Sequence, residues 1–407
     1  MTSGITSTKH PVVLIHGVFG YGKTRPLWNT WSPYWPETAL SEMNQNHLMV
    51  DVGALSSDHD RACEAFYQLY GGRVDYGEQH SREAGHNRYG ATFGGTTALE
   101  LYQLICSDFF GVGSDYRWVV SLVSIAGPLT GSTVTHLFGL HELRMVPYSL
   151  GHFIGAALGV WFKLQTDWPV LRRVFDFKMP QWQCVTSFRE ILSPYGRING
   201  STDLAVFNIL PRERMKRNAQ LIHMDKIFLV SVATSTLDYA SIPSLYALLL
   251  VMRRHVRTLN KIFEGFDREL WSENDGAVNL HSMLQPWTAL IDSKVSKESA
   301  DSDTESTTST ASSLSGLVEA TEVAASTSNE LTEDRNLNIN QTGSDLDPTD
   351  PVNYSELRRG NWYVHRVEKN HMAGTHFDRD SPALFQRLFR VMANHFESTQ
   401  SLDKANL

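Results

Sequence analysis

The 407-residue chain has few cysteines and no run of basic residues. Its three cysteines, Cys63, Cys106 and Cys184, cannot form a complete disulfide framework, and none stands in a CxxC pair, so we expect buried thiols. The formal net charge of −8 and the lack of a basic cluster exclude the electrostatic footprint of a nucleic-acid-binding protein. With 42% hydrophobic residues the chain can still bury a large core, which excludes disorder throughout.

The sequence also lacks a secretory signal pattern and a long apolar run. The stretch MTSGITSTKHPVVLIHG has no charged start followed by an apolar middle and a small-residue cleavage site, which predicts a cytoplasmic location. The apolar stretch 146–162 approaches the lower length limit of a membrane span, but it contains Pro147, His152 and several glycines, so a buried or interfacial helix pair is favoured. A second apolar run, 240–252, ends at Arg253 and predicts a core or pocket helix.

Aromatic residues are missing between Trp287 and Tyr354, where the region 293–353 is rich in Ser, Thr, Asp and Glu. Such a segment buries too little to order itself, so we expect a disordered insertion. A solvated insertion is favoured over a phosphorylation-regulated linker. Residues 8–292 and 354–398 then form two parts of one domain, and the pattern DSPALFQRLFRVMANHF in the second part predicts an amphipathic helix.

What the chain does contain is an alternation of β-branched runs with helix-like stretches. The runs PVVLI (11–15), WVVSLVSI (118–125) and IFLVSV (227–232) predict buried strands of a parallel sheet, and thus the α/β fold class. Active sites in such sheets gather at the carboxyl ends of the strands. The glycines of HGVFG (16–20) follow the first strand and allow backbone N–H groups to face a bound oxyanion. An ordinary glycine-rich turn is the alternative.

Metal-ligating residue types gather in the segment after the first strand. Asp60, His80 and His86 offer one carboxylate and two imidazoles, and Asp203 in GSTD could complete a four-coordinate N/O site suited to zinc. Histidines on loops are more often solvated, so this spacing alone is a weak indication.

Several strings together resemble a known family. DRACEA, GGRVDYG and GHNRYG, with PVVLIHG before them and VFDFKMPQW after them, resemble the thermostable bacterial lipases of the Geobacillus and Staphylococcus type and their plant and fungal relatives. The resemblance covers most of the chain outside the insertion. It implies an α/β-hydrolase fold with a doubly wound, mainly parallel sheet, and hydrolysis of carboxylic esters in acylglycerols. It also implies a zinc subdomain (about 56–90 plus 203) and a helical lid (about 134–171) that opens at a lipid surface. Simple core packing is the alternative for the lid region.

The resemblance implies a structural zinc but no calcium. The zinc ligands of the family match two aspartates and two histidines here: Asp60, His80, His86 and Asp203. His59 stands where an aromatic residue usually precedes the first aspartate. The family's calcium-binding glutamate is replaced by Ala373, although Asp378 is retained, so calcium is not expected.

The resemblance further implies a triad in the chain order Ser, Asp, His. Asp275, in WSENDGAVNLHSM, matches the acid that orients an imidazole, with a plain turn residue as the alternative. His371, in EKNHMAG, matches the base, and His376 in the same loop is the second candidate. The N–H of Val18 would be one oxyanion donor.

The serine of this triad is not found. In the family a buried strand and a (G/A)HSxGG turn precede a helix, and here GGTTALELYQLI (94–105) resembles that helix directly after Phe93. By this comparison about twenty residues are absent between Phe93 and Gly94, including the elbow. No serine has Gly or Ala two residues before it and Gly two after it; Ser149 comes nearest. A splice product, an error in deriving the chain from its gene, and a real protein with a rearranged sheet remain open.

We therefore expect a lipase-type hydrolase with impaired or absent turnover. The alternative is a non-catalytic protein that binds lipid or a partner and retains the zinc subdomain.

Overall fold

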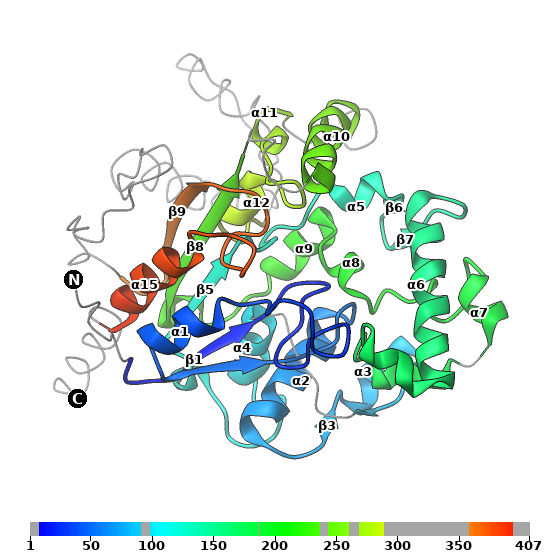
Figure 1. Ribbon diagram of the computed structural model, residues 1–407, viewed down its shortest axis with the longest axis horizontal. Coiled ribbons are helices and arrows are strands. Elements are labelled where there is room, and N and C mark those ends of the chain that lie inside the picture. Colours follow the sequence, from blue (N-terminus) through cyan, green and yellow to red (C-terminus); the bar gives the residue numbers. More distant parts are fainter. Residues whose placement is uncertain are drawn as a thin grey trace, which may run out of the picture.

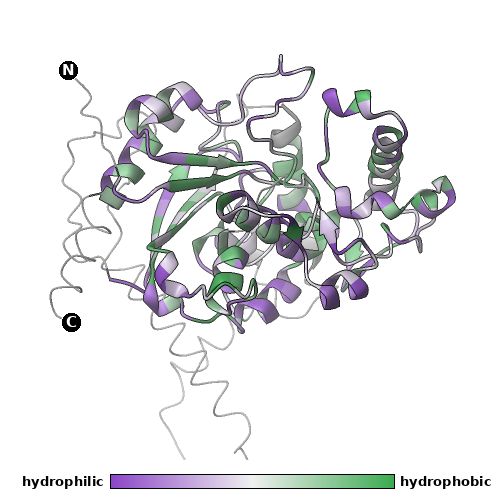
Figure 2. Cartoon of the chain, turned by 90° about the horizontal axis from the view of Figure 1, so that it is seen from below, coloured by the Kyte–Doolittle hydropathy of each residue, from purple (hydrophilic) through white to green (hydrophobic). Residues whose placement is uncertain are grey.

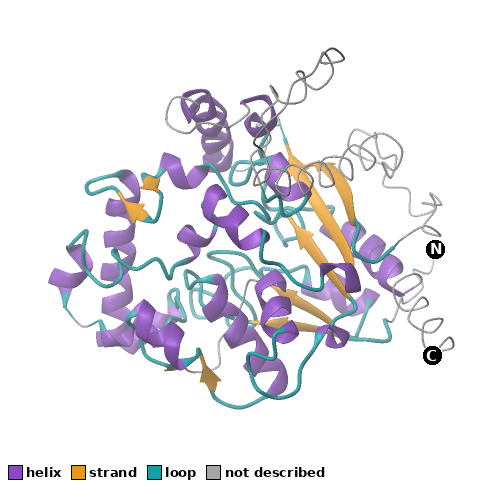
Figure 3. Cartoon of the chain, turned by 180° about the vertical axis from the view of Figure 1, so that it is seen from behind, coloured by secondary structure: helices purple, strands orange, loops and turns teal. Residues whose placement is uncertain are grey.

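The computed structural model shows an α/β protein in which helices cover two groups of parallel strands (Figures 1 and 3). The predicted insertion, 293–353, and the junction between Phe93 and Gly94 lie outside the described residues. The structure describes residues 8–90, 98–185, 187–236, 243–259, 268–288 and 358–393.

Five of the described strands form two separate parallel sheets. Strand β1 (Val12–Ile15) pairs with β2 (His47–Val50), with Val12 opposite His47. The second sheet has the order β5-β8-β9, in which β8 lies in the centre. Its strands span Ser121–Ile125, Phe228–Ser235 and Trp362–Glu368. All three predicted strands are confirmed, but the expected single sheet is divided, because no described strand pairs with the facing edges of β1 and β5.

Helices cover these strands on both faces. The apolar side chains of α15 (Ser381–Val391) pack in one cluster with Leu14 of β1 and Val230 of β8. On the opposite face, α2 (Asp58–Tyr70) and α4 (Ala98–Cys106) pack against β1 and β2 in a second cluster. Helix α4 also contacts β5 and β8 through a third cluster. The hydropathy colouring agrees with this arrangement, because green residues follow the strands (Figure 2). The helices α4 and α15 therefore each contact both sheets.

Local sequence explains where the two long covering helices begin and end. The hydroxyl of Ser57 caps α2 by accepting a hydrogen bond from the N–H of Asp60, and Gly71 follows the helix at φ 97°, which favours glycine. Helix α15 has Pro382 in its first turn, where no N–H is needed, and buries a stripe at helical spacing. That stripe comprises Leu384, Phe385, Leu388 and Phe389. The amphipathic helix predicted here is confirmed.

The region that the sequence suggested as a lid contains a small hairpin and one long helix. The hairpin pairs β6 (Leu140–His141) with β7 (Arg144–Met145), and α6 (Leu150–Asp167) follows. The expected helix pair is therefore wrong, because Pro147 and Ser149 delay the helix and the residues before it pair as strands. None of the helices in the described ranges is both long and apolar enough to cross a bilayer.

Shorter elements complete the fold. Within the predicted run 240–252, the described residues 243–252 form part of α10 (Pro243–Leu259), which confirms a helix there. The remaining α-helices are α1 (Glu37–Met43), α3 (Glu78–Ala84), α5 (Val134–Leu137), α7 (Phe188–Leu192), α8 (Ala205–Asn208), α9 (Pro211–Asn218), α11 (Arg268–Ser272) and α12 (Leu280–Leu284). Strands β3 (Val74–Asp75) and β4 (Tyr89–Gly90) form a short antiparallel pair, and 3-10 turns span Tyr116–Trp118, Pro169–Arg173, Pro180–Cys184 and Met224–Lys226.

Candidate functional site

An aspartate and a histidine meet at the carboxyl end of the central strand β8. Oδ2 of the fully buried Asp275 lies 2.9 Å from Nδ1 of His371, which is in the loop after β9. The same oxygen accepts a hydrogen bond of 2.6 Å from the hydroxyl of Thr234. The other oxygen, Oδ1, accepts the N–H groups of Ala277 and Val278. One carboxylate oxygen thus fixes the local turn and the other orients the imidazole, so both interpretations of Asp275 describe real contacts.

The electrostatics of this pair suit a general base. Burial alone would lower the pKa of His371, but the charge of Asp275 and the hydrogen bond to it raise that pKa above 6.5. With the N–H on Nδ1 directed at the carboxylate, the lone pair of Nε2 can accept a proton. Within the described part of the chain, no serine hydroxyl or cysteine thiol hydrogen-bonds to this Nε2.

The other candidates from the sequence lie elsewhere. His376 is exposed, its N–H bonds to the carbonyl of Tyr34, and its ring contacts Phe377, so its imidazole does not face Asp275. The hydroxyl of Ser149 accepts the N–H of His152 and caps α6. Asp378, at the position retained from the calcium site, accepts a hydrogen bond of 3.0 Å from Lys369.

The loop after β1 presents a backbone donor to the same region. Val18 and His371 both line one cavity. No acceptor among the described residues bonds to the N–H of Val18, whereas the N–H of Phe19 bonds to Ala54. Gly20 is required by close packing, because a Cβ there would lie 2.6 Å from Nδ1 of His16. The loop is therefore a folded turn in which the N–H of Val18 has no acceptor among the described residues.

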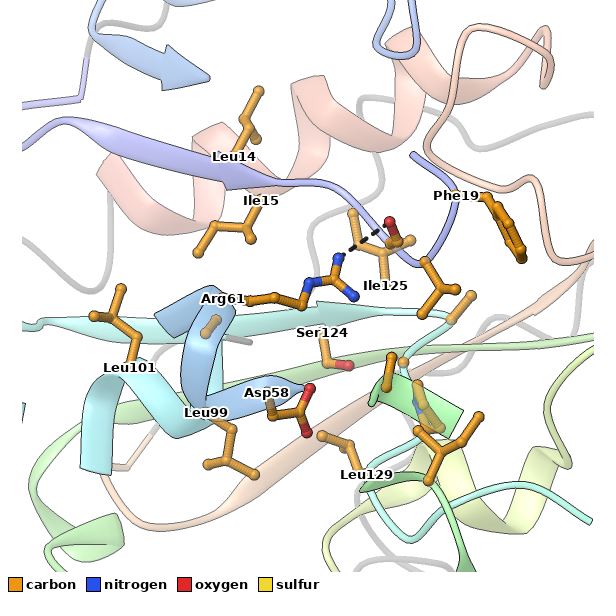
Figure 4. Close-up of a pocket in the computed structure, with 18 of the residues that line it drawn as sticks. Leu14, Ile15, Phe19, Asp58, Arg61, Leu99, Leu101, Ser124, Ile125 and Leu129 are labelled. Atoms are coloured by element: carbon orange, nitrogen blue, oxygen red, sulfur yellow. Dashed lines mark hydrogen bonds between the residues drawn. The ribbon is translucent and has the colours of Figure 1, made fainter. Parts of the chain in front are cut away.

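Sequence reasoning missed the buried arginine that holds this loop. Arg61 is 1% exposed, and its Nη2 donates to the carbonyls of His16 and Gly17, each at 3.2 Å. Figure 4 shows its side chain between β1 and β5. Burial lowers the pKa of Arg61 to about 10. Its signal in the sequence is a charged residue within the apolar helix pattern of DRACEAF.

A buried ion pair contacts the chain directly after the same loop, at Gly22. Nζ of Lys178 contacts Oδ1 of Asp51, and this oxygen also accepts the N–H of Gly22 at 3.0 Å. Burial raises the pKa of Asp51, but His16 and Lys178 more than offset this and lower it to about 2. Lys178 lies in the string VFDFKMPQW, but Asp51 lies in none of the strings named above, so the sequence contained no indication that the two residues form a pair.

The four predicted metal ligands come together in one cluster. Nε2 of His80 lies 3.0 Å from Asp60 Oδ1 and 3.3 Å from Asp203 Oδ1, and Nε2 of His86 lies 3.1 Å from Asp203 Oδ2. One donor atom from each residue falls within 4.8 Å of the others. Asp60 is on α2, His80 on α3 and Asp203 on the loop before α8, so the cluster joins three segments. Two nitrogens and two carboxylate oxygens at this separation are donor types and a donor number that are consistent with a zinc site.

Two observations show that the cluster fits a metal ion. Nε2 of His86 and Oδ2 of Asp203 are buried and have no hydrogen-bond partner among the described residues, since their 3.1 Å approach lacks hydrogen-bond geometry. The outer contacts also orient the ligands: Nδ1 of His86 bonds to the carbonyl of Asn87 at 2.9 Å, and the amide of Gln181 donates to Asp60 at 2.7 Å.

Without a cation the same residues form an ion cluster. Burial lowers the pKa of each histidine, but the two carboxylates more than offset it, which raises the pKa of His80 to about 9 and that of His86 to about 10. A divalent ion would displace these protons. His59 packs beside the cluster, with its ring 4.0 Å from that of His80 and its Nε2 2.9 Å from the carbonyl of Tyr76.

One cavity of about 1240 Å³ connects the loop after β1 with His371. It extends from the space between β1 and β5 past His371 to α6, where Ile154 and Leu158 line it. Helix α6 combines a packed face, where a Cβ on Gly159 would lie 2.6 Å from Ile191, with an exposed apolar residue, Phe153. The lining is mostly aliphatic and aromatic, which suits an apolar ligand.

The fold and the site define a class: an α/β-hydrolase-like protein with an aspartate–histidine pair and an apolar cavity at the carboxyl edge of a parallel sheet. A family profile described as "Lipase-like, C-terminal domain" matches residues 8–99. The chain is 40% identical over 340 residues to a lipase of Staphylococcus hyicus, covering 68% of this chain and 48% of that protein. It is 27% identical over 327 residues to lipase 2 of Staphylococcus aureus strain MRSA252, covering 68% of this chain and 45% of that protein.

A solved structure of the Staphylococcus hyicus lipase superposes with a TM-score of 0.60 at 17% identity, covering 97% of both chains. These matches place the chain in the staphylococcal-type bacterial lipase family. The chain spans about half the length of the two lipases that it matches in sequence.

Proposed function

We propose that the chain carries the acid–base machinery of a triacylglycerol lipase but has impaired or absent turnover. The observation that carries the first half is the contact of 2.9 Å between Asp275 and His371 beside the apolar cavity. In an intact triad Nε2 of His371 would take the proton of a hydroxyl nucleophile and pass it to the leaving alcohol, while Asp275 stabilises the imidazolium. The N–H of Val18 would stabilise the oxyanion of the tetrahedral intermediate. The substrates would be acylglycerols or other ester lipids.

The second half of the proposal concerns the nucleophile. No described hydroxyl bonds to His371, and Ser149, the nearest match to an elbow serine, caps a helix instead. Loss of the nucleophile removes nearly all covalent catalysis and leaves only the effects of binding and oxyanion donors. We propose that the junction between Phe93 and Gly94 lacks the strand and the elbow that would supply it.

We further propose that Asp60, His80, His86 and Asp203 hold a structural Zn²⁺. The ion would join α2 and α3 to the loop at residue 203, and its binding energy would add to the stability of the folded state only. It would not touch the reacting atoms, because the four ligands are outside the lining of the cavity.

A second function from another class is a non-catalytic binder of lipids or of a partner. The specific observation in its favour is a large apolar cavity whose histidine lacks a hydroxyl partner among the described residues. The exposed apolar residues of α6, such as Leu150 and Phe153, would contact a lipid surface in either case.

Turnover and covalent labelling test the proposal directly. We expect the purified chain to hydrolyse p-nitrophenyl butyrate no faster than its His371→Ala variant and to resist labelling by a fluorophosphonate. The matched control is His376→Ala, which removes an exposed histidine from the same loop. Labelling that His371→Ala abolishes and His376→Ala retains would contradict the missing nucleophile. Saturable binding of a fluorescent fatty acid without turnover would favour the non-catalytic binder.

A further inference from the structure

The two sheets face each other across a space that lies between β1 and β5 and is part of the cavity. Strands β1 and β5 run in the same direction on opposite sides of the cavity, and Arg61 lies at one end of the space (Figure 4). Every residue of β1 and every residue of β5 lines the cavity. We call this space the slot and define it by Val12–Ile15 on one side and Ser121–Ile125 on the other.

Hydrogen bonding along β5 leaves alternate backbone groups directed at the slot. The N–H of Phe228 bonds to the carbonyl of Val120, and the N–H of Ala126 bonds to the carbonyl of Val232. In a parallel ladder this pattern directs the even-numbered residues of β5 towards β8. The N–H and C=O groups of the odd-numbered residues, including Val123 and Ile125, must then point away from β8, into the slot.

The same alternation holds for β1. The N–H of Val12 bonds to the carbonyl of Asn46, so Val12 and Leu14 are directed towards β2. The backbone groups of Val13 and Ile15 therefore point into the slot from the opposite side. Within the described ranges, no strand pairs with either of these edges.

The other two walls of the slot are helices. Leu99 and Leu101 of α4 line it on one face, and Leu388 and Phe389 of α15 line it on the other. An acyl chain could contact these apolar walls, but it has no donors or acceptors for the strand edges. The edge residues Val13, Ile15, Val123 and Ile125 are half-buried. Only an occupant with its own peptide groups can pair with the N–H and C=O groups of both edges, so the slot favours such an occupant.

We propose that the slot binds an extended polypeptide segment of consecutive apolar residues, supplied by another molecule, as a strand parallel to both β1 and β5. Its backbone would pair with the inward-facing groups of both strands, and its side chains would pack alternately on α4 and α15. A strand buried on both faces is apolar at every position, which defines the chemistry of the partner. The proposal does not depend on ester hydrolysis.

Fluorescence anisotropy with a labelled peptide tests the binding. The probe is Lys-Lys-Val-Ile-Val-Leu-Val-Lys-Lys, and its control carries proline at two central positions, which removes N–H groups. We expect the full chain to bind the probe saturably and the proline control at least tenfold more weakly. Equal binding of the two peptides would overturn the proposal, because it would show apolar adsorption without strand pairing.

A matched pair of variants locates the binding. Leu101→Trp puts an indole into the slot, whereas Leu104→Trp puts one on the same helix at a position that does not line the cavity. We expect only Leu101→Trp to weaken binding, by tenfold or more. Melting curves check that each variant folds, and equal loss of affinity in two folded variants would contradict the assignment.

Hydrogen exchange of the unmodified chain is independent of any variant. With single-residue resolution, the probe should slow exchange at Val13, Ile15, Val123 and Ile125 and leave their even-numbered neighbours, which are already bonded, unchanged. Slow exchange at these four amides before the peptide is added would show that the chain fills the slot itself and would overturn the proposal. The proposal would also be overturned if oleate displaced the probe and the exchange rates of these amides did not change, because the probe would then have been bound without strand pairing.

Discussion

Replacement of Asp203 by asparagine distinguishes two interpretations of the four-residue cluster, a zinc site and an ion cluster without a metal. The substitution keeps the size of the side chain but removes the charge that lies 3.3 Å from His80 and 3.1 Å from His86. In the wild-type chain, free zinc at a hundred times its dissociation constant would add about 2.7 kcal/mol to the free energy of unfolding. If loss of one ligand weakens the site a thousandfold, the same zinc concentration would add less than about 0.1 kcal/mol.

The measurement is the melting temperature with zinc minus the melting temperature with EDTA, compared between the two proteins. Because each protein is its own reference, any change in the metal-free state cancels. We expect a difference of roughly 5 °C for the wild-type chain and almost none for Asp203→Asn. The control is Asp225→Asn, which changes a largely exposed aspartate outside the cluster and should keep the full difference.

Two results would contradict a zinc site at these four residues. One is a wild-type chain that retains no stoichiometric zinc by elemental analysis and melts at the same temperature in zinc and in EDTA. The other is an Asp203→Asn variant that keeps the full zinc-dependent rise, which would show that the metal binds elsewhere.

Three further outcomes follow from the charged groups of the structure. Lys178→Met should lower the free energy of unfolding by about 2 to 4 kcal/mol, because it leaves the carboxylate of Asp51 buried without its cation. The control Lys216→Met, at an exposed ion pair, should change the free energy of unfolding by under about 1 kcal/mol, and urea denaturation measures both. The lowered pKa of Asp51 contributes roughly 2 kcal/mol of stability that is present above about pH 3.8 and is lost as the pH falls towards 2. Acid denaturation of the wild-type chain should show this loss of stability, and in Lys178→Met the loss should begin at a higher pH. Asp275→Asn should lower the pKa of His371, because only burial then acts on it, and NMR titration of the imidazole measures the shift; an unchanged titration in the variant would contradict the pairing. The stability that this pair contributes to the wild-type chain is present below about pH 6.5 and is lost as the pH rises through the raised pKa of His371.

The structure brings together residues that the sequence could only nominate. Asp275 and His371 are far apart in the chain, and only the packing of β8 and β9 puts their side chains in contact. Resemblance to a family nominated both, while the choice of His371 over His376 depended on which imidazole the loop turns inward. Arg61 was overlooked, because its partners are backbone carbonyls that no motif records.

Patterns along the chain account for most of the local elements of this protein. The strands at 11–15, 118–125 and 227–232 and the amphipathic helix near the end follow from hydrophobic spacing, which depends on near neighbours in the chain. The helix after the Phe93–Gly94 junction was expected from the resemblance to a family. The division of the strands into two sheets is seen only in the folded structure, because strand pairing depends on which strand edges lie next to each other in space. The slot between β1 and β5 and the ion pair of Asp51 with Lys178 arise from such long-range contacts, which hydrophobic spacing does not indicate.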